Sequence, residues 1–283
     1  MRVVVTGGSG KAGRHVVQAL AEGGHEVINL DRTKLEGLQS KNVVLDLEDT
    51  GAVYDVLAEV KPEGVCHLAA NPSPGGFARS DTFRGNTMIT YNVMQAAGDL
   101  GVRRFINAGS EMATGWLTTE ELPPRIPFTE EDRVDSPNAY ALSKYMSEVI
   151  ADSLSVRYPE MPICTLRINN VIPPEKQDEM LRPRREQFPG PGSANFWSYI
   201  DARDVGTAFC AALEGESVGH EVFLIAAADT CIEVPLAKAI EERYGTKPNM
   251  ASDHGDFQSA FDCGKIKRFF GWTAAHSWRD AQR

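Results

Sequence analysis

The chain has 283 residues, of which 42% are hydrophobic, and its formal net charge at pH 7 is −10. Such a chain can bury a core as one large domain, or as one domain with a smaller lobe, and its acidity argues against nucleic acid or an anionic membrane surface as partners. Its longest apolar runs span a few residues, whereas a membrane-spanning helix needs ~20, so we expect no membrane segment.

The cysteines, the histidines and the first residues bear on the cellular compartment. The five cysteines are widely spaced and form no Cys-x-x-Cys pair, and the six histidines show no metal-ligand spacing. Neither a disulfide framework nor a metal site is therefore expected. Residues 2–6 resemble a strand rather than part of a signal peptide. Together these features predict a cytoplasmic protein with reduced thiols and no metal.

The first 167 residues alternate short β-branched runs with longer amphipathic stretches. We predict strands at residues 2–6, 26–30, 43–45, 64–68, 103–107 and 163–167. Helices are predicted between them, near residues 12–23, 49–60, 82–100 and 138–157. Strands that alternate with helices form βαβ crossovers and a parallel sheet with helices on both faces. The expected fold class is therefore α/β, a Rossmann-type doubly wound parallel sheet.

Beyond residue 167 the pattern becomes less regular. Residues 172–198 are rich in Pro, Gly and Arg and predict a lobe dominated by loops. Two helices and a strand between them are predicted further on, at residues 202–214, 234–244 and 221–226 respectively. We expect a main domain over residues 1–167 and a small C-terminal lobe over residues 168–283, partly interleaved with it.

A glycine-rich loop follows the first predicted strand. It has the sequence Thr6-Gly7-Gly8-Ser9-Gly10-Lys11-Ala12-Gly13, with glycines spaced as G-x-x-G-x-x-G, and a helix starts near Ala12. Such glycines permit a tight turn and a close approach of the backbone to a pyrophosphate, which the helix N-terminus stabilises. A nucleotide-triphosphate loop is excluded, because Ala12 replaces the Ser or Thr that holds magnesium. The loop predicts a dinucleotide cofactor held by Gly7, Gly10, Lys11, Ala12 and Gly13.

The second predicted strand ends beside Asp31 and Arg32. A carboxylate about 20 residues beyond the glycine loop accepts hydrogen bonds from the ribose hydroxyls of NAD and repels the additional phosphate of NADP. An Arg in the next position could instead pair with that phosphate. We expect NAD as the cofactor, with NADP as the less favoured alternative. Residues 1–167 are accordingly the expected NAD-binding domain.

Tyr140 and Lys144 are four residues apart near the start of a predicted helix, and so they share one of its faces. A phenol titrates near 10, and a base at neutral pH needs this pKa lowered toward ~7, which a neighbouring ammonium and the positive nicotinamide of oxidised NAD could achieve. Ser110 follows the fifth predicted strand, at the edge of a parallel sheet where ligands bind. No Gly-x-Ser-x-Gly elbow surrounds it, which argues against a serine hydrolase. We predict Ser110, Tyr140 and Lys144 as catalytic residues.

These motifs together resemble the extended short-chain dehydrogenase/reductase family, in its NAD-dependent epimerase/dehydratase group, over nearly the whole chain. The resemblance includes Asp46-Leu47, His67-Leu68-Ala69-Ala70, the helix opened by Asn86, and residues 166–171, 199–205 and 270–272. It implies that Ser110, Tyr140 and Lys144 form the family's Ser-Tyr-Lys triad. It also implies cofactor contacts from Asp46, Leu47, Leu68, Ala69, Ala70, Asn86, Tyr140, Lys144 and Ile168.

Three departures from the family pattern bear on the substrate. Ile172-Pro173-Pro174 stands where the family usually has Tyr-Gly-Pro, Glu111 follows Ser110 where a small residue is usual, and only 28 residues (171–198) separate Asn170 from Tyr199. This short span leaves little room for a nucleotide clamp. We therefore predict an NAD-dependent dehydrogenase of a small carbohydrate, a free sugar or a sugar acid. The alternatives are a nucleotide-sugar epimerase or dehydratase that uses tightly bound NAD transiently, and a non-enzymatic dinucleotide-sensing protein.

The lobe over residues 168–283 is the expected substrate-binding part. The expected substrate contacts are Ser73, Ser110, Glu111, Asn170, Arg182 and Arg203. For Asn170, Arg182 and Arg203, loop anchoring, packing or exposure to solvent is the alternative. Arg167 is expected as an internal ion-pair partner. The resemblance also implies a homodimer formed through the helices that carry Asn86 and Tyr140.

Overall fold

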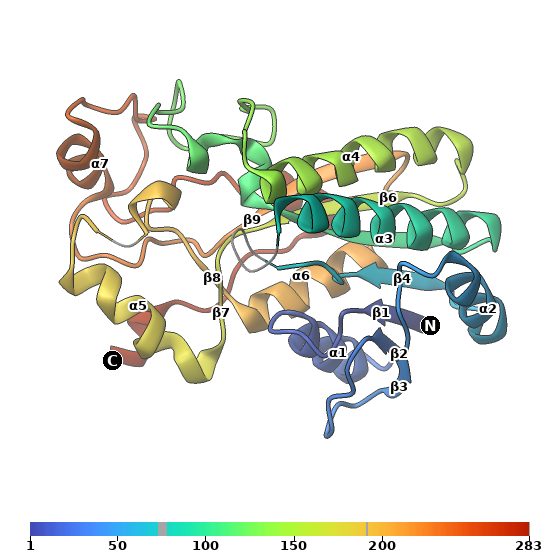
Figure 1. Ribbon diagram of the computed structural model, residues 1–283. Helices are drawn as coiled ribbons and strands as arrows, with labels where there is room; N and C mark the ends of the chain where they lie inside the picture. Colours follow the sequence, from blue (N-terminus) through green and yellow to red (C-terminus); the bar gives the residue numbers. More distant parts are fainter. Residues whose placement is uncertain (73–77, 191, 283) are drawn as a thin grey trace.

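The computed structural model describes residues 1–72, 78–190 and 192–282, and within them the chain is built around a parallel sheet of seven strands (Figure 1). The spatial order is β3-β2-β1-β4-β5-β6-β9, and all neighbouring strands run parallel. The strands are β1 (Arg2–Thr6), β2 (Glu26–Asp31), β3 (Lys41–Val44), β4 (Gly64–His67), β5 (Arg104–Ser110), β6 (Ile163–Ile168) and β9 (His220–Ile225). The predicted Rossmann-type α/β fold is confirmed.

Helices cover both faces of the sheet. The helices are α1 (Gly13–Glu22), α2 (Thr50–Val60), α3 (Arg79–Asp99), α4 (Ala139–Arg157), α5 (Gln177–Glu186), α6 (Ala202–Glu214), α7 (Leu236–Tyr244) and α8 (Gly264–Phe270). In Figure 1, α3 and α4 run side by side above the sheet, whereas α1 and α6 lie below it. Each layer has its own core, with Leu20 and Phe209 buried below the sheet and Val93 and Leu154 buried above it. No helix within the described ranges combines the length and apolar character that a membrane span requires.

Local sequence signals set the points where two of these helices begin. The carboxylate of Asp49 caps α2, and the side-chain oxygen of Asn138 caps α4 by accepting hydrogen bonds from the N–H groups of Tyr140 and Ala141. Each cap satisfies backbone donors that have no partner inside the helix. The Asn138 cap matters for the site, because it places the start of α4 directly before Tyr140.

A lobe at one end of the sheet has a separate apolar core. This core gathers buried side chains from distant parts of the chain, among them Trp116, Phe128, Phe196, Trp197, Leu224 and Trp278. Two short strands, β7 (Val171–Ile172) and β8 (Ile200–Asp201), pair in parallel. The lobe and the sheet domain are interleaved, because residues 111–134 contribute to the lobe while α6 and β9 return to the sheet.

Two helices lie where the sequence predicts none. The expectation of a loop-dominated segment at residues 172–198 is wrong at α5, which even contains Pro183. Proline lacks a backbone donor and opposes a helix interior. Leu181 of the same helix is fully buried in the lobe core, however, and this packing outweighs the local signal. α8 has only seven residues, too few to show a hydrophobic period, and Ile266 is its one buried residue.

Candidate active site

A cavity of about 780 Å³ opens at the carboxyl ends of the central strands. Its wall takes in the glycine-rich loop after β1, the end of β2, the segment after β4, the end of β5 and the start of α4. The strands that follow β1 in the chain, β2 and β3, lie on one side of it, whereas those that follow β4, namely β5, β6 and β9, lie on the other side. The strand order therefore reverses between β1 and β4. Parallel α/β sheets bind ligands at such a switch point. The cavity is therefore the candidate site.

The glycine-rich loop leaves β1 by a turn that requires glycine. Gly7 has a φ of +73°, and a Cβ on it would lie 2.6 Å from the nitrogen of Ala69. A Cβ on Gly13 would lie 2.1 Å from the carbonyl oxygen of Gly7, so α1 could not pack against the loop. At Gly10 a Cβ would meet only that same oxygen, at 3.1 Å, and would otherwise project into the cavity. Glycine at position 10 thus leaves room for a bulky group such as a pyrophosphate.

The start of α1 suits a negatively charged group. This helix has no side-chain cap and no acidic residue in its first turn, and its first residue, Gly13, lines the cavity together with the preceding Ala12. The positive end of the helix dipole therefore favours an anion there. Burial lowers the pKa of Lys11, and the charges of Arg184 and Lys176 lower it further, so three cationic side chains gather near the loop. These features fit the pyrophosphate of a dinucleotide.

Asp31 ends β2 with its carboxylate at the cavity wall. Its two oxygens accept hydrogen bonds from the N–H groups of Ser9, at 3.0 Å, and of Thr33, at 3.1 Å. These bonds hold the carboxylate beside the glycine-rich loop. Arg32 also lines the cavity but is exposed. An acceptor in this position suits the ribose hydroxyls of NAD.

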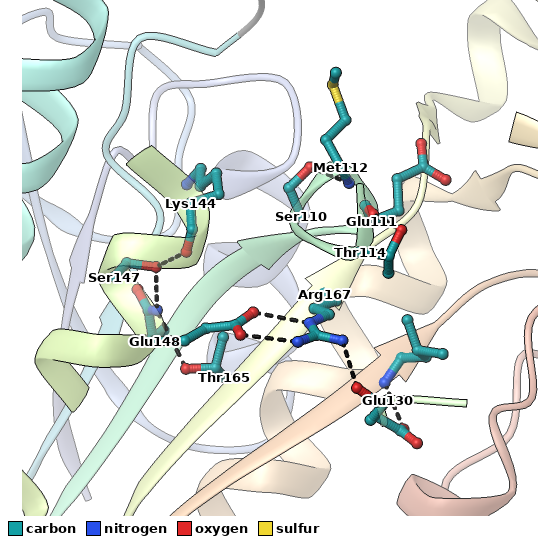
Figure 2. Close-up of polar contacts among 12 residues, drawn as sticks. Ser110, Glu111, Met112, Thr114, Glu130, Lys144, Ser147, Glu148, Thr165 and Arg167 are labelled. Carbon is teal, nitrogen blue, oxygen red and sulfur yellow. Dashed lines mark hydrogen bonds and ion pairs between the residues drawn. The ribbon is translucent and has the colours of Figure 1, made fainter. Parts of the chain in front are cut away.

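Ser110, Tyr140 and Lys144 meet at the cavity wall. β5 extends past its predicted end at residue 107 to Ser110, because it pairs with β6 as far as Ile168. The hydroxyl of Ser110 faces the phenol of Tyr140 and lowers its pKa. The ammonium of Lys144 donates to the carbonyl oxygen of Ala108 at 2.8 Å, which anchors it to β5. Figure 2 shows Lys144 on α4 and Ser110 at the end of the neighbouring strand.

Burial shifts the pKa values of Tyr140 and Lys144 in opposite directions. Burial raises the pKa of Tyr140 to about 12, although the neighbouring Ser110 lowers it, and the charge of Glu111 raises it as well. Burial lowers the pKa of Lys144 to about 8. The expected lowering of the Tyr140 pKa by Lys144 is not seen in the protein alone, because the ammonium is directed to Ala108 and desolvation dominates. A base at Tyr140 therefore needs further positive charge in the cavity, such as that of an oxidised nicotinamide ring.

Most of the residues predicted to bind the cofactor line this cavity. They are Gly7, Gly10, Lys11, Ala12, Gly13, Asp31, Arg32, Leu47, Leu68, Ala69, Ala70, Tyr140, Lys144 and Ile168. Asp46 is exposed outside the lining and accepts a hydrogen bond from the N–H of Glu48. Asn86 lies behind the wall, where its oxygen accepts from the N–H of Asn71 at 2.7 Å and its amide donates to Ser143 at 3.0 Å. Asn86 thus anchors the segment after β4.

The predicted substrate residues divide into two groups. Ser110, Glu111 and Asn170 line the cavity. Arg182 and Arg203 lie outside the lining, because Arg182 faces Asp178 one turn earlier on α5, at 3.6 Å, and Arg203 pairs with Asp201, at 2.9 Å. Ser73 lies outside the described residues.

Several polar residues of the site were missed by sequence reasoning. Ser9, Asn71 and Asn169 all line the cavity. Each is adjacent in the chain to a residue that was predicted to bind the cofactor or the substrate, and this position next to a predicted residue could have indicated it. Arg184 belongs to the basic run of residues 182–185 that contains the predicted Arg182. Only the unpredicted helix α5 brings Arg184 to the place where its charge acts on Lys11 and on Glu111.

A buried ion pair lies next to the cavity wall and joins α4 to the sheet. Arg167 on β6 donates to both carboxylate oxygens of Glu148 on α4, at 2.8 and 2.9 Å, and to the carbonyl oxygen of Glu130 at 2.9 Å (Figure 2). The side chains of Arg167 and Glu148 are only 4% and 5% exposed. The predicted ion-pair role of Arg167 is confirmed. Glu148 lies one turn beyond Lys144, so the pair fixes α4 against the sheet close to the site.

Comparisons with known proteins agree with this geometry. A family model described as "NAD dependent epimerase/dehydratase family" matches residues 3–226. A UDP-glucose 4-epimerase of Bacillus subtilis (strain 168) is 25% identical over 99% of this chain and 96% of the relative. An L-arabinose 1-dehydrogenase (NAD(P)(+)) of Haloferax volcanii is 31% identical over 64% of this chain and 71% of the relative. The structure of a UDP-glucose 4-epimerase of Thermotoga maritima with UDP-glucose has a TM-score of 0.74 and 24% identity, covering 98% of this chain and 94% of that chain.

Proposed function

This chain belongs to the NAD-dependent epimerase/dehydratase family, and we propose that it is an epimerase that inverts a hydroxyl-bearing carbon of a nucleotide-linked sugar. It is an enzyme of the extended short-chain dehydrogenase/reductase type, and its cofactor is NAD. The observation that carries the proposal is the meeting of Ser110, Tyr140 and Lys144 at a cavity that also contains the glycine-rich loop and Asp31.

The proposed chemistry begins with the removal of a proton from a sugar hydroxyl. The phenol oxygen of Tyr140, as phenolate, accepts this proton, and Ser110 orients the sugar oxygen by a hydrogen bond. Lys144 is placed to hydrogen-bond the cofactor ribose from the same wall. When bound, NAD supplies the site that accepts the hydride and returns it. In an epimerase Tyr140 then gives the proton back, so neither a proton nor a hydride is consumed overall.

A second candidate is net oxidation of a free sugar, the dehydrogenase predicted from the sequence. One specific observation favours it: only 28 residues separate Asn170 from Tyr199, ten of them in α5, and this span forms a short lobe. The Haloferax volcanii relative, an arabinose dehydrogenase, is in line with this alternative. The full-length similarity to the Bacillus subtilis epimerase supports the epimerase more strongly.

A single assay separates the two candidates. Purified enzyme is incubated with NAD and either nucleotide sugars or free aldoses, with absorbance at 340 nm recorded and the sugars resolved by chromatography. The epimerase proposal expects two interconverting epimers of a nucleotide sugar and no net rise in absorbance. A sustained rise with a free aldose, without epimer formation, would instead establish the dehydrogenase.

We also propose that the protein is a homodimer that pairs through α3 and α4. These helices lie side by side (Figure 1) and expose large apolar side chains to solvent, namely Met88, Tyr91, Leu142 and Val149. Two residues on each helix therefore form one apolar surface, and a twofold axis would bury it against its copy.

A further inference from the structure

His67 ends β4 between the cavity and the core, and no step of the proposed chemistry uses it. The strand register places it beside Thr6, the last residue of β1. Both residues are buried, with His67 at 2% and Thr6 at 0% exposure. A buried imidazole needs hydrogen-bond partners, and these partners show which elements of the fold it joins.

Each ring nitrogen of His67 lies against a threonine hydroxyl. Nδ1 is 2.7 Å from the Thr6 Oγ1, and Nε2 is 3.2 Å from the Thr90 Oγ1 of α3. The Thr90 hydroxyl donates its one hydrogen to the carbonyl oxygen of Asn86, at 2.8 Å, so it can only accept from His67. We therefore assign the hydrogen of the neutral ring to Nε2, with Nδ1 accepting from the Thr6 hydroxyl.

The surroundings of His67 keep this ring neutral. Burial lowers its pKa to about 3, and the positive charge of Lys144 on α4 acts in the same direction. A protonated ring would direct an N–H at Thr6, whose own hydroxyl hydrogen would then lose its acceptor. The order of donors and acceptors around the ring is therefore constant near neutral pH.

On one side of His67 the hydrogen bonds lead to the glycine-rich loop. Thr6 directly precedes Gly7, the first glycine of that loop. The Thr6 Oγ1 accepts from the N–H of Ala69, at 3.3 Å, and the Thr6 carbonyl oxygen accepts from the N–H of Leu68, at 3.0 Å. Leu68 and Ala69 line the cavity. Thr6 thus fixes the start of the loop against the segment that follows His67.

On the other side of His67 the hydrogen bonds lead to Tyr140. Asn86, whose carbonyl oxygen accepts from Thr90, donates through its side-chain amide to the hydroxyl of Ser143 at 3.0 Å. Ser143 in turn donates to the carbonyl oxygen of Tyr140 at 2.7 Å. Thr90, Asn86 and Ser143 are all buried, so water does not compete for these bonds. The His67 network, from Ala69 through Thr6, His67, Thr90, Asn86 and Ser143 to Tyr140, therefore joins the glycine-rich loop to the start of α4.

We propose that His67 is a positioning residue, which fixes the glycine-rich loop relative to α4 so that a cofactor held by the loop stays aligned with the phenol of Tyr140. The inference rests on the proposed function in that it takes Tyr140 to be the base. It is independent of whether the substrate is a nucleotide sugar or a free sugar. Sequence reasoning predicted the loop and Tyr140 separately, and the His67 network is the connection between them.

The alignment can be measured without a sugar. The positive charge of oxidised nicotinamide favours the phenolate of Tyr140, and this effect weakens as the distance between them grows. The phenolate absorbance of the NAD-saturated enzyme is therefore titrated against pH. The same titration of NAD-saturated Tyr140→Phe is subtracted, which removes the signal of the other tyrosines. The midpoint of the difference is the pKa of Tyr140 in the complex with NAD.

Two variants break the His67 network at neighbouring points. His67→Asn keeps an oxygen that can accept from Thr6, but its shorter side chain does not reach Thr90. Thr90→Val removes the hydroxyl and keeps the branched shape of the side chain. In each NAD-saturated variant the midpoint should lie at least about one pH unit above that of the wild type, a tenfold fall in the ionisation constant. The double variant should show no further rise, because both changes break the same network.

Thr87→Val is the matched control. It removes a hydroxyl from the same helix, α3, and this hydroxyl has no hydrogen-bond partner in the part of the chain that the structure describes. Its midpoint should equal that of the wild type. The unfolding temperature and the affinity for NAD are measured for every variant, so that folded and NAD-loaded proteins are compared. If His67→Asn does not fold, Thr90→Val decides the question.

Three results would overturn the inference. A folded, NAD-loaded Thr90→Val or His67→Asn with the midpoint of the wild type would mean that His67 only stabilises the core. A double variant whose rise equals the sum of the two single rises would mean that the residues act separately. A wild type without any phenolate that Tyr140→Phe removes would refute the assignment of Tyr140, and the inference with it. Failure of the epimerase assay alone would leave the inference intact, because the titration requires only NAD.

Discussion

Tyr140 and Lys144 show how burial acts on neighbouring groups of opposite type. Burial penalises charge, so the phenol of Tyr140 holds its proton more firmly, with a pKa of about 12, and the ammonium of Lys144 holds its proton less firmly, with a pKa of about 8. Both residues are thus biased toward their neutral forms. The phenolate needed as a base must be favoured by positive charge that arrives with the bound ligands, which couples proton removal to occupancy of the site.

Replacing Tyr140 by Phe tests the assignment of the base. This change removes the phenol oxygen that is assigned as the proton acceptor, and we expect turnover to fall by roughly 10²- to 10⁴-fold. Affinity for NAD should be retained, since the ring still lines the cavity. The matched control is Tyr145→Phe on the same helix, whose ring lies under Arg133 and which should stay active. Steady-state turnover and NAD titration provide the readouts, and an active Tyr140→Phe enzyme would refute the assignment.

Glu111 makes stability depend on pH in a direction that follows from its shift. Its pKa rises from an ordinary 4.5 to about 8 on folding, so the folded state binds the proton more tightly than the unfolded chain. The stabilisation from this group is fully present below pH 4.5 and is lost as the pH rises toward 8.

Glu111→Gln should therefore raise the unfolding temperature relative to the wild type, and more so at pH 8 than at pH 5. Thermal melts of both proteins across this range measure the difference. A gap that stays constant or narrows with rising pH would mean that the Glu111 carboxyl is already ionised in the folded protein.

α4 is tied to its surroundings at successive turns, which explains how it can present two reacting side chains accurately. Asn138 caps its start, and Ser143 accepts a hydrogen bond from Asn86 of α3. Further along, Ser147 accepts one from Asn107 of β5, and Glu148 pairs with Arg167 of β6. These contacts hold α4 against α3 and against the sheet, and all three pairs of residues are buried.

Removing Arg167 should show how much stability depends on its ion pair with Glu148. Arg167→Met leaves the Glu148 carboxylate buried without a partner, and we expect a loss of about 3–5 kcal/mol in the free energy of unfolding. The double variant Arg167→Met/Glu148→Leu removes both charges and should recover much of this loss. Urea unfolding of both variants measures the difference. If the double variant were no more stable than Arg167→Met, an unpaired buried charge would not be the cause.

At the scale of the whole molecule, one apolar surface is buried within the chain and another stays exposed to solvent. The apolar side chains of the lobe core are covered because residues 111–134, α5 and the C-terminal segment pack together. The outer face of α3 and α4 stays open, with Met88, Tyr91, Leu142 and Val149 between 38% and 44% exposed. A second copy of the chain is the proposed cover for this face.

Placing a charge on that face should separate the proposed dimer. Leu142→Glu or Tyr91→Asp would have to bury a carboxylate at the interface, and we expect either variant to elute as a monomer. Val218→Glu makes a similar change at a residue that is 82% exposed and lies outside α3 and α4, and it should leave the dimer intact. Size-exclusion chromatography with light scattering measures the mass. A wild-type protein of monomer mass would refute the proposed dimer.

Features that depend on neighbouring residues in the chain were predictable from the sequence. The alternation of strands and helices, the glycine-rich loop, Asp31 at the end of β2 and the four-residue spacing of Tyr140 and Lys144 follow from hydrophobic period, backbone freedom and helix geometry. These are local properties, and a parallel sheet brings the ends of its central strands to one edge whatever the details of packing. Most of the NAD half of the site was therefore foreseeable.

Features that depend on contacts between distant segments of the chain could not be predicted from the sequence. α5 forms around Pro183 because Leu181 is buried in the lobe core, and only then does Arg184, rather than Arg182, reach toward the cavity. The cluster of Glu111 with Asn195 joins the end of β5 to a loop more than 80 residues later. The raised pKa values of Glu111 and Tyr140 likewise arise from desolvation, which exists only once the chain has packed. Substrate recognition belongs to this second class. The protonation and the polar contacts of the residues involved depend on burial in the folded chain and not on their spacing in the sequence.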